Sequence, residues 1–427
     1  MLHLQIKNLI QVGRRHGFTE RAFGNSCTRK QALVEKIFKR KTQPGYAFLT
    51  LPDAEANLKK IKQYVKEQEK NKWANIVVLG IGGSALGAIA VRDALKSEFA
   101  KGPKLYILDN IDPAYTTELL SNIHLAKTLF VVISKSGTTT EPMIQYGLVK
   151  EMLQKKFPAN YQKHLVFVTD PKGGLLRKIA KEEKITAFDI PPKIGGRFSV
   201  LTNVGLLPCA LAGIDIGGLL KGAREMREAI KRSKGMHNPA LALAVAQFML
   251  DKKKKKAVTV LMPYCNYLFR VGDWYRQLLA ESIGKSRRAG PTPINALGTT
   301  DQHSQLQLWN DGPNNKFIIF MRVLRHATNP KVGKILPEEI GFLNGKKFGE
   351  VMDAAYLGTS QALTKHQRPN VTIEVPQVDA RSLGALFMLF EFQVALLGLL
   401  YKVNAFNQPG VEHSKQITKK ILKGDEK

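Results

Sequence analysis

The chain has few cysteines for its length. Its 427 residues include three, Cys27, Cys209 and Cys265, and they lie too far apart to form the close spacing of a zinc site. An odd number of scattered cysteines also argues against a disulfide framework, so a reducing cytosol is the expected compartment. Cys209 and Cys265 stand in apolar or aromatic sequence and are expected to be packing residues.

Acidic residues are also scarce, with 35 Asp and Glu against 65 Lys and Arg and a formal net charge of +30. Such a field raises the encounter rate of anionic ligands and promotes loose nucleic-acid binding. However, the lysines are spread over many amphipathic segments, and the sequence has no zinc-finger spacing or basic helix interleaved with aromatic residues. A dedicated nucleic-acid site is therefore not expected.

A secretion signal and a membrane span are likewise not expected. Residues 1–31 are basic, but they contain no continuous apolar stretch and no convincing cleavage site. The most apolar stretch, residues 384–401, has Glu391 and Gln393 near its middle, and an ionised carboxylate there would cost several kcal/mol in lipid. We expect this stretch to be a buried helix of a cytoplasmic protein.

Short apolar runs alternate with helical sequence along the whole chain. The first half contains "WANIVVLG", "KLYILDN", "TLFVVIS" and "HLVFVTD", and the second half contains "AVTVLMPYC", "KFIIFMRVL" and "NVTIEVP". Strands that are apolar on both faces and alternate with helices indicate parallel sheets covered by helices. The sequence predicts an α/β protein with a basic N-terminal arm (1–44), two α/β domains (45–215 and 230–400) and a C-terminal helical tail (401–427).

Two loops rich in glycine or hydroxyl groups stand where an apolar run gives way to helical sequence. Residues 131–143 read "VVISKSGTTTEPM", and "LGIGGSALG" ends its run with Gly80, Gly82 and Gly83. In open α/β sheets, ligands bind where strands lead into helices, and a helix N-terminus offers unpaired N–H groups that suit phosphate. Ordinary helix capping could explain one such loop. Two loops, one with five hydroxyl groups and a lysine, favour a phosphate site.

The glycine loop matches neither common nucleotide motif. Its glycines lack the third position of a dinucleotide fingerprint, although Asp109 follows the next apolar run near where a ribose-binding acid would stand. No Gly-Lys-Ser/Thr sequence ends the loop as it would in a Walker motif. A single phosphate on a small molecule is the expected ligand.

Several polar side chains could supply chemistry beside that phosphate. Arg197 follows two glycines in "IGGRFSVLTNVG" and could stabilise an oxyanion. Glu281 falls in the last turn of an expected helix, where the helix dipole favours its action as a base. His303 lies among turn residues, and Gln408 and Lys415 lie in the turn that opens the last helix. Each could instead be an ordinary surface or structural residue, but together they suit proton transfer next to a carbonyl group.

These segments strongly resemble the glucose-6-phosphate isomerases (phosphoglucose isomerases) in their shorter bacterial form. "IGGRFSVLTNVG" and "GLLYKVNAFNQPGVEHSK" are similar to the two signatures of that family. "LGIGGSALG", "SKSGTTTEP", "AESIGK" and "GTTDQHS" occur in the family's order and spacing. The resemblance covers the chain from "GYAFLTLP" to the C-terminus.

The resemblance implies two flavodoxin-like sugar-isomerase domains and a homodimer whose active sites lie at the subunit interface, with neither metal nor cofactor. By position, Glu281 matches the base that moves a proton between C2 and C1 through a cis-enediol, and Arg197 matches the arginine that stabilises this intermediate. His303, from the partner subunit, and Lys415 match the groups associated with opening the sugar ring. The residues expected to surround the sugar and its phosphate are Gly83, Ser84, Ser134, Lys135, Ser136, Thr139, Glu141 and Gln408.

The expected function is the reversible isomerisation of glucose 6-phosphate and fructose 6-phosphate in glycolysis and gluconeogenesis. Two alternatives stay open at this point. One is a dual isomerase that also accepts mannose 6-phosphate, which the hydroxyl-rich loop does not exclude. The other is a non-catalytic regulator that binds sugar phosphates, although it would not need Glu281 and His303 in these positions.

Overall fold

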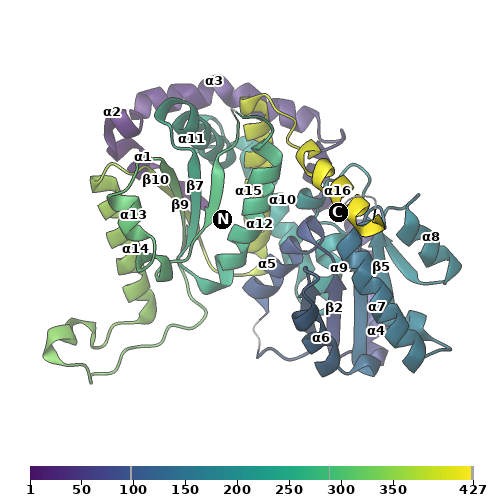
Figure 1. Ribbon diagram of the computed structural model, residues 1–427. Helices are drawn as coiled ribbons and strands as arrows, with labels where there is room; N and C mark the ends of the chain where they lie inside the picture. Colours follow the sequence, from purple (N-terminus) through teal and green to yellow (C-terminus); the bar gives the residue numbers. More distant parts are fainter. Residues whose placement is uncertain (97–98, 288, 425–427) are drawn as a thin grey trace.

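The computed structural model describes residues 1–96, 99–287 and 289–424, which form two five-stranded sheets with helices on both faces (Figure 1). The predicted α/β class with parallel sheets and a C-terminal helix is confirmed. The helices are α1 (Lys7–Gln11), α2 (Gly13–His16), α3 (Glu20–Lys39), α4 (Glu55–Gln68), α5 (Leu86–Leu95), α6 (Pro113–Asn122), α7 (Thr140–Lys156), α8 (Leu175–Glu182), α9 (Asn203–Leu211), α10 (Ile216–Arg232), α11 (Pro239–Lys254), α12 (Phe269–Ile283), α13 (Leu306–Asn310), α14 (Phe348–Lys365), α15 (Ala380–Tyr401) and α16 (Glu412–Lys423).

The first sheet is entirely parallel, with strand order β3-β2-β4-β5-β6. Its strands are β2 (Asn75–Leu79), β3 (Lys104–Leu108), β4 (Thr128–Ile133), β5 (Leu165–Thr169) and β6 (Thr186–Asp189). Successive side chains of a strand point to opposite faces. Accordingly, Val78 and Val131 pack into one core and Val77 and Val132 into another. This explains why these strands read as continuous apolar runs.

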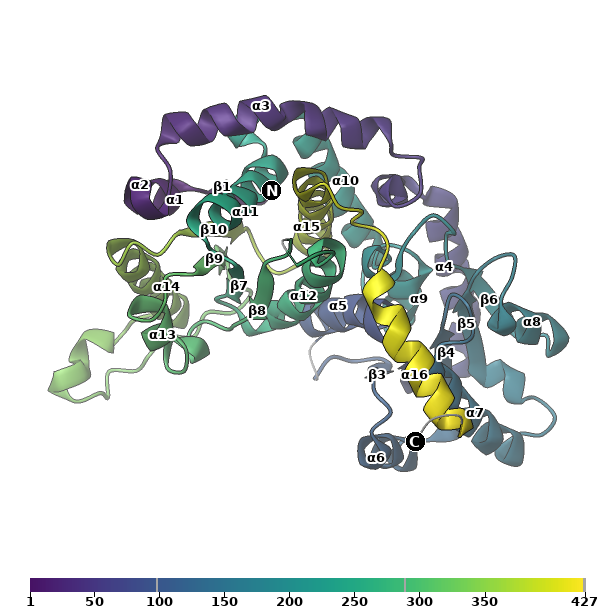
Figure 2. The ribbon, with the colours of Figure 1, turned by 45° about the horizontal axis from the view of Figure 1, so that its top comes forward.

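The second sheet has the order β1-β10-β9-β7-β8 and contains one antiparallel strand. Its strands are β1 (His3–Gln5), β7 (Val258–Pro263), β8 (Thr292–Asn295), β9 (Lys316–Val323) and β10 (Asn370–Val375). The antiparallel strand β1 comes from the basic N-terminal segment, where Leu4 lies opposite Ile373 of β10. Helix α3 of the same segment runs along the molecule and contacts α10, α11 and α15 (Figure 2).

Three strands, β1, β6 and β8, were not predicted, and all three lie at sheet edges. They are only three or four residues long and are largely half-buried or exposed. An edge strand has one neighbour and often little apolar surface to cover. Consequently no apolar run marks these strands in the sequence.

Helix α15 lies between the two sheets, packed against α10, α11 and α12 (Figure 1). Its length and mean hydropathy of 2.0 would suit a membrane span, but 89% of its most apolar window is buried inside the protein. The predicted buried helix is therefore confirmed. Glu391 in this helix is fully buried, and neither carboxylate oxygen has a hydrogen-bond partner among the described residues. Burial raises the pKa of Glu391 well above its ordinary value.

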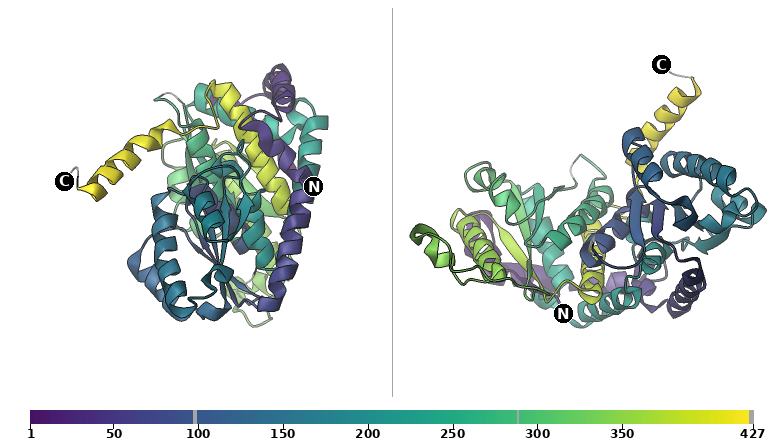
Figure 3. Two further views of the ribbon diagram at one scale, coloured as in Figure 1. Left: turned by 90° about the vertical axis from the view of Figure 1, so that its right-hand side faces the viewer. Right: turned by 90° about the horizontal axis from the view of Figure 1, so that it is seen from below.

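The last helix, α16, projects away from the body of the protein (Figure 3). None of its residues is buried, although Ile417, Ile421 and Leu422 give it apolar positions. A second protrusion, residues 324–348, extends from the opposite side of the molecule and carries exposed Ile335 and Phe342 (Figure 1).

Candidate active site

The loops after β2 and β4 open a cleft of about 790 Å³ at the carboxyl edge of the first sheet. These strands are neighbours, but the chain continues from β2 to β3 on one side and from β4 to β5 on the other. Such a topological switch point leaves a crevice that α/β proteins use for ligands. The residues lining the cleft include Gly83, Ser84, Ser134, Lys135, Ser136, Thr139, Glu141, Arg197, Glu281, Gln408 and Lys415.

The hydroxyl-rich loop is held in shape by its own side chains. Ser134 Oγ accepts a hydrogen bond from the Gly137 N–H (3.0 Å) and lies 3.1 Å from Thr139 Oγ1. Ser136 Oγ accepts from the Thr138 N–H at 3.1 Å. Gly137 has a φ of +70°, and a Cβ there would stand 2.2 Å from the backbone nitrogen of Leu176. This conformation favours glycine, so the tight turn requires glycine between the hydroxyl residues.

Lys135 joins this loop to the segment that precedes Arg197. Its Nζ donates to the carbonyl oxygens of Pro192 (2.7 Å) and Ile194 (3.2 Å). An ammonium group has three donors, so one N–H is left for a ligand. The loop leads into α7, whose N-cap Thr139 makes no side-chain cap. The first N–H groups of a helix have no partner within it, and Pro142 has no N–H group, so Thr140 and Glu141 supply the N–H groups that could serve an anion here.

The glycine loop after β2 packs directly against the backbone beside Arg197. A Cβ on Gly83 would lie 2.3 Å from the backbone carbon of Gly196 and 2.8 Å from the Arg197 nitrogen. Real side chains do not approach backbone atoms so closely, so only glycine allows this contact. The contact brings Ser84, in the turn just before α5, together with Arg197 in the lining of the cleft.

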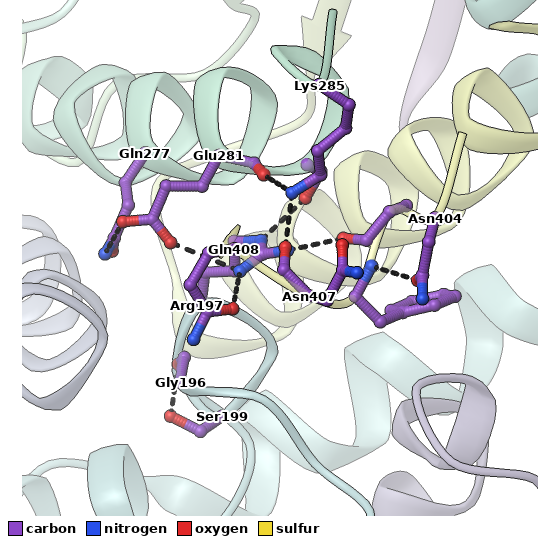
Figure 4. Close-up of polar contacts among 12 residues, drawn as sticks. Gly196, Arg197, Ser199, Gln277, Glu281, Lys285, Asn404, Asn407 and Gln408 are labelled. Carbon is purple, nitrogen blue, oxygen red and sulfur yellow. Dashed lines mark hydrogen bonds and ion pairs between the residues drawn. The ribbon is translucent and has the colours of Figure 1, made fainter. Parts of the chain in front are cut away.

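Arg197 is 3% exposed and uses all five of its N–H donors within the protein (Figure 4). Burial lowers the pKa of Arg197, and the neighbouring Glu281 carboxylate opposes this effect. The acceptors are Ser282 Oγ (2.7 Å), Glu281 Oε2 (3.2 Å), Gln408 Oε1 (3.1 Å) and the carbonyl oxygens of Ala405 (2.5 Å) and Asn407 (3.0 Å).

Glu281 reaches the cleft from the last turn of α12 and keeps 34% of its side chain exposed. One carboxylate oxygen pairs with Arg197, and the other accepts from Gln277 Nε2 at 3.0 Å (Figure 4). Gln277 stands four residues earlier on the same helix, so both side chains lie on one face. Glu281 is therefore held by two donors while its carboxylate stays open to a ligand.

The family described as phosphoglucose isomerase matches residues 46–427. The chain belongs to the phosphoglucose isomerase family. It is 44% identical over 411 residues to a glucose-6-phosphate isomerase of Carboxydothermus hydrogenoformans, with 92% of this chain and 87% of the relative covered. It is 36% identical over 421 residues to the enzyme of that name from Rubrobacter xylanophilus, with 96% of each chain covered.

Solved structures share the fold of this chain. A hypothetical protein from Thermus thermophilus is 31% identical with a TM-score of 0.89, covering 99% of this chain and all of that one. A glucose-6-phosphate isomerase from Chlamydia trachomatis has the same fold at 22% identity, with a TM-score of 0.84 over 94% of this chain and 85% of that chain.

Of the remaining predicted residues, Gln408 and Lys415 lie in the cleft, whereas His303 does not. Gln408 lies in the cleft bonded to Arg197. Lys415 reaches the cleft from α16, but its Nζ forms an exposed ion pair with Glu412 at 2.9 Å. His303 is exposed in the turn before α13 and is not among the described residues that line the cleft. Within one chain, His303 and Glu281 are therefore not brought together.

Two residues that support the cleft were not predicted from the sequence. Gln277 holds Glu281, and its spacing of four residues from Glu281 on an expected helix could have indicated this contact. Lys285 donates to the backbone carbonyls of Glu281 and Asn407. The second of these acceptors is remote in sequence, so no local pattern indicates it. Burial and the nearby Arg197 lower the pKa of Lys285 to about 8.

Proposed function

We propose that this protein interconverts glucose 6-phosphate and fructose 6-phosphate by proton transfer. One arrangement supports the proposal above all: the Glu281 carboxylate and the Arg197 guanidinium share a cleft with two loops suited to phosphate. Relatives named glucose-6-phosphate isomerase are similar over most of the chain. The hydroxyl-rich loop and the N-termini of α5 and α7 bind the substrate phosphate and fix the sugar at one end.

In the proposed reaction, Glu281 removes the proton from C2 of the open-chain aldose. The electron pair of the broken C2–H bond forms the C1–C2 double bond, and the π pair of the C1 carbonyl moves to O1, which gains a proton to give the cis-enediol. The O2 hydroxyl then loses its proton and becomes the C2 carbonyl, while C1 takes the proton back from Glu281 to give the ketose. Arg197 stabilises the negative charge on the sugar oxygens through its positive charge, while its five hydrogen bonds within the protein hold the guanidinium in place. Lys415 and His303 assist ring opening, in which the ring oxygen gains a proton and the C1 hydroxyl loses one. Glu141 and Gln408 line the sugar site.

This reaction reduces C1 and oxidises C2 of the same molecule, so it needs no external oxidant or reductant, and we expect it to proceed without a bound metal or cofactor. The test is a coupled assay that follows formation of fructose 6-phosphate from glucose 6-phosphate with protein pretreated with EDTA. We expect the rate to match that of untreated protein. Loss of activity that a divalent cation restores would contradict the mechanism. Mannose 6-phosphate in the same assay shows whether the second aldose is also a substrate.

We further propose that the protein is a cytoplasmic homodimer whose cleft is completed by the partner's His303. In the part of the chain that the structure describes, His303 does not line its own cleft. The projecting helix α16 and the protrusion at 324–348 expose Ile421, Leu422 and Phe342, whose apolar surface a second copy of the chain would cover.

Complementation between two inactive variants tests this shared site. Glu281→Gln and His303→Ala homodimers should each have little activity. Mixed dimers contain one site with both changes and one site with neither, so activity should return when the two proteins are unfolded together and refolded. A mixture that stays inactive, although mass spectrometry detects mixed dimers, would show that each cleft uses its own chain's histidine.

A further inference from the structure

The carbonyl oxygen of Asn407 is held by two cations from different parts of the chain (Figure 4). Arg197 Nη2 donates to it at 3.0 Å, and Lys285 Nζ donates to it from the end of α12. The same Nζ also donates to the carbonyl oxygen of Glu281. Lys285 thus links the last turn of α12, which carries Glu281, to the turn that carries Gln408.

That turn has few other attachments. Phe406 packs against Tyr46 and Phe198, with ring centroids 4.7 and 5.1 Å apart respectively. Beyond it, Asn407 and Gln408 are exposed, and no residue of α16 is buried. The orientation of the peptide between Asn407 and Gln408 therefore depends on the two cations that hold its carbonyl oxygen, together with the bond from Arg197 to the Gln408 side chain.

Lys285 follows Gly284, the C-cap residue of α12. The last four carbonyl groups of a helix have no partner within the helix, and a lysine at this end can satisfy one of them. Capping alone does not explain this position, since the ammonium group is half-buried beside the Arg197 guanidinium. Burial and like charge both oppose its ionisation. The bond to the second acceptor, the Asn407 carbonyl oxygen, ties the end of α12 to another segment of the chain, which helix capping alone would not do.

We propose that Lys285 is a positioning residue, whose ammonium group fixes the Asn407–Gln408 turn against the end of α12 so that Gln408, Arg197 and Glu281 converge on one sugar. This inference rests on the proposed function for its kinetic consequences and on the contacts alone for its structural ones. Loss of the link lets the turn move while the phosphate loops, which lie on the first sheet, keep their place.

The experiment compares Lys285→Met, Lys285→Arg and a matched control, Lys96→Met, with the unaltered protein. Lys96 is also a half-buried lysine that donates to a backbone carbonyl, that of Ala212, but it makes no bond to the end of α12 or to the Asn407–Gln408 turn. Lys285→Met should lower kcat on the order of tenfold to a hundredfold, as expected for a small misplacement of reacting groups. KM should change little, and Lys285→Arg should recover most of the rate.

Hydrogen exchange supplies a readout that does not need activity. Lys285→Met should speed amide exchange in residues 404–411, and Lys96→Met should leave that segment unchanged. If the unaltered protein does not isomerise hexose phosphates, the proposed function fails. The exchange measurement then still tests whether Lys285 holds the Asn407–Gln408 turn in place. Unchanged exchange, or a loss of kcat that Lys96→Met reproduces, would overturn the positioning role.

The pH profile adds a third readout. Among the described residues, only Arg197 and Glu281 carry charges that act on Lys285, and the Asn407 turn brings none. As pH rises through about 8, Lys285 loses its positive charge and its hold on the two carbonyls weakens. The unaltered protein should therefore lose kcat on this alkaline side, and Lys285→Arg should extend the plateau, since arginine stays charged. Identical alkaline limbs in both proteins would count against the proposal.

Discussion

Replacing Glu281 with glutamine should lower kcat by about a thousandfold or more and leave the binding of hexose phosphates nearly intact. General acid–base catalysis contributes roughly a hundredfold to ten-thousandfold, and no other described carboxylate in the cleft is paired with Arg197. Glutamine has the same shape and its amide oxygen can still accept from Arg197, so the cleft should keep its form. The change therefore removes the base without removing the site.

Two measurements separate these effects. The coupled assay gives kcat and KM, and calorimetry with a hexitol 6-phosphate, which cannot isomerise, gives binding. Glu55→Gln is the control, because Glu55 also pairs with an arginine, Arg224 (2.7 Å), but lies outside the cleft. We expect its turnover to be unchanged. A Glu281→Gln protein with ordinary kcat would remove this residue from the reaction.

The second large effect concerns stability. Replacing Glu391 with methionine should stabilise the protein at neutral pH, because the buried carboxyl has no hydrogen-bond partner among the described residues and methionine has a similar volume. The sign follows from the raised pKa. The folded state holds a proton that the unfolded chain releases, so the protein loses stability as pH rises above the unfolded value near 4.5.

The size of the effect is set by linkage. Above that value, the free energy of unfolding should fall by about 1.4 kcal/mol per pH unit through this group, until the carboxyl ionises in the folded state. Denaturant unfolding of Glu391→Met and of the unaltered protein, over a series of pH values, should give a difference that widens with this slope.

Gln393→Met provides the matched control for that series. Gln393 is fully buried two residues further along α15 and donates to Gln247 at 2.5 Å, but it cannot titrate. Its replacement should shift stability by the same amount at every pH. A difference between Glu391→Met and the unaltered protein that does not vary with pH would show that Glu391 is solvated or paired in the folded protein.

The parts of the fold that could be predicted from sequence are those in which local pattern and burial agree. Residues 75–79 and 128–133 read as strands because both of their faces are buried. The edge strand at Thr186–Asp189 does not, since two of its four residues are exposed. The phosphate loops were predictable for a similar reason, because glycine and hydroxyl residues at a strand end have few other uses.

The cleft itself was only partly predictable. Arg197 stood out because two glycines precede it, but its five acceptors come from α12 and the segment 405–408, which no spacing relates to Arg197. Lys285 and Gln277 look like ordinary polar residues of a helix surface. Their contacts depend on how α12 meets the tail, which only the folded chain specifies.

A single apolar core includes residues of both sheets, with α15 in its centre. The halves of the molecule are therefore rigidly joined rather than hinged, since any rotation of one sheet against the other would pull side chains of α15 out of their packing. Any opening and closing around a substrate must therefore come from segments outside this shared core. The tail beyond Phe406 is the most weakly anchored of them.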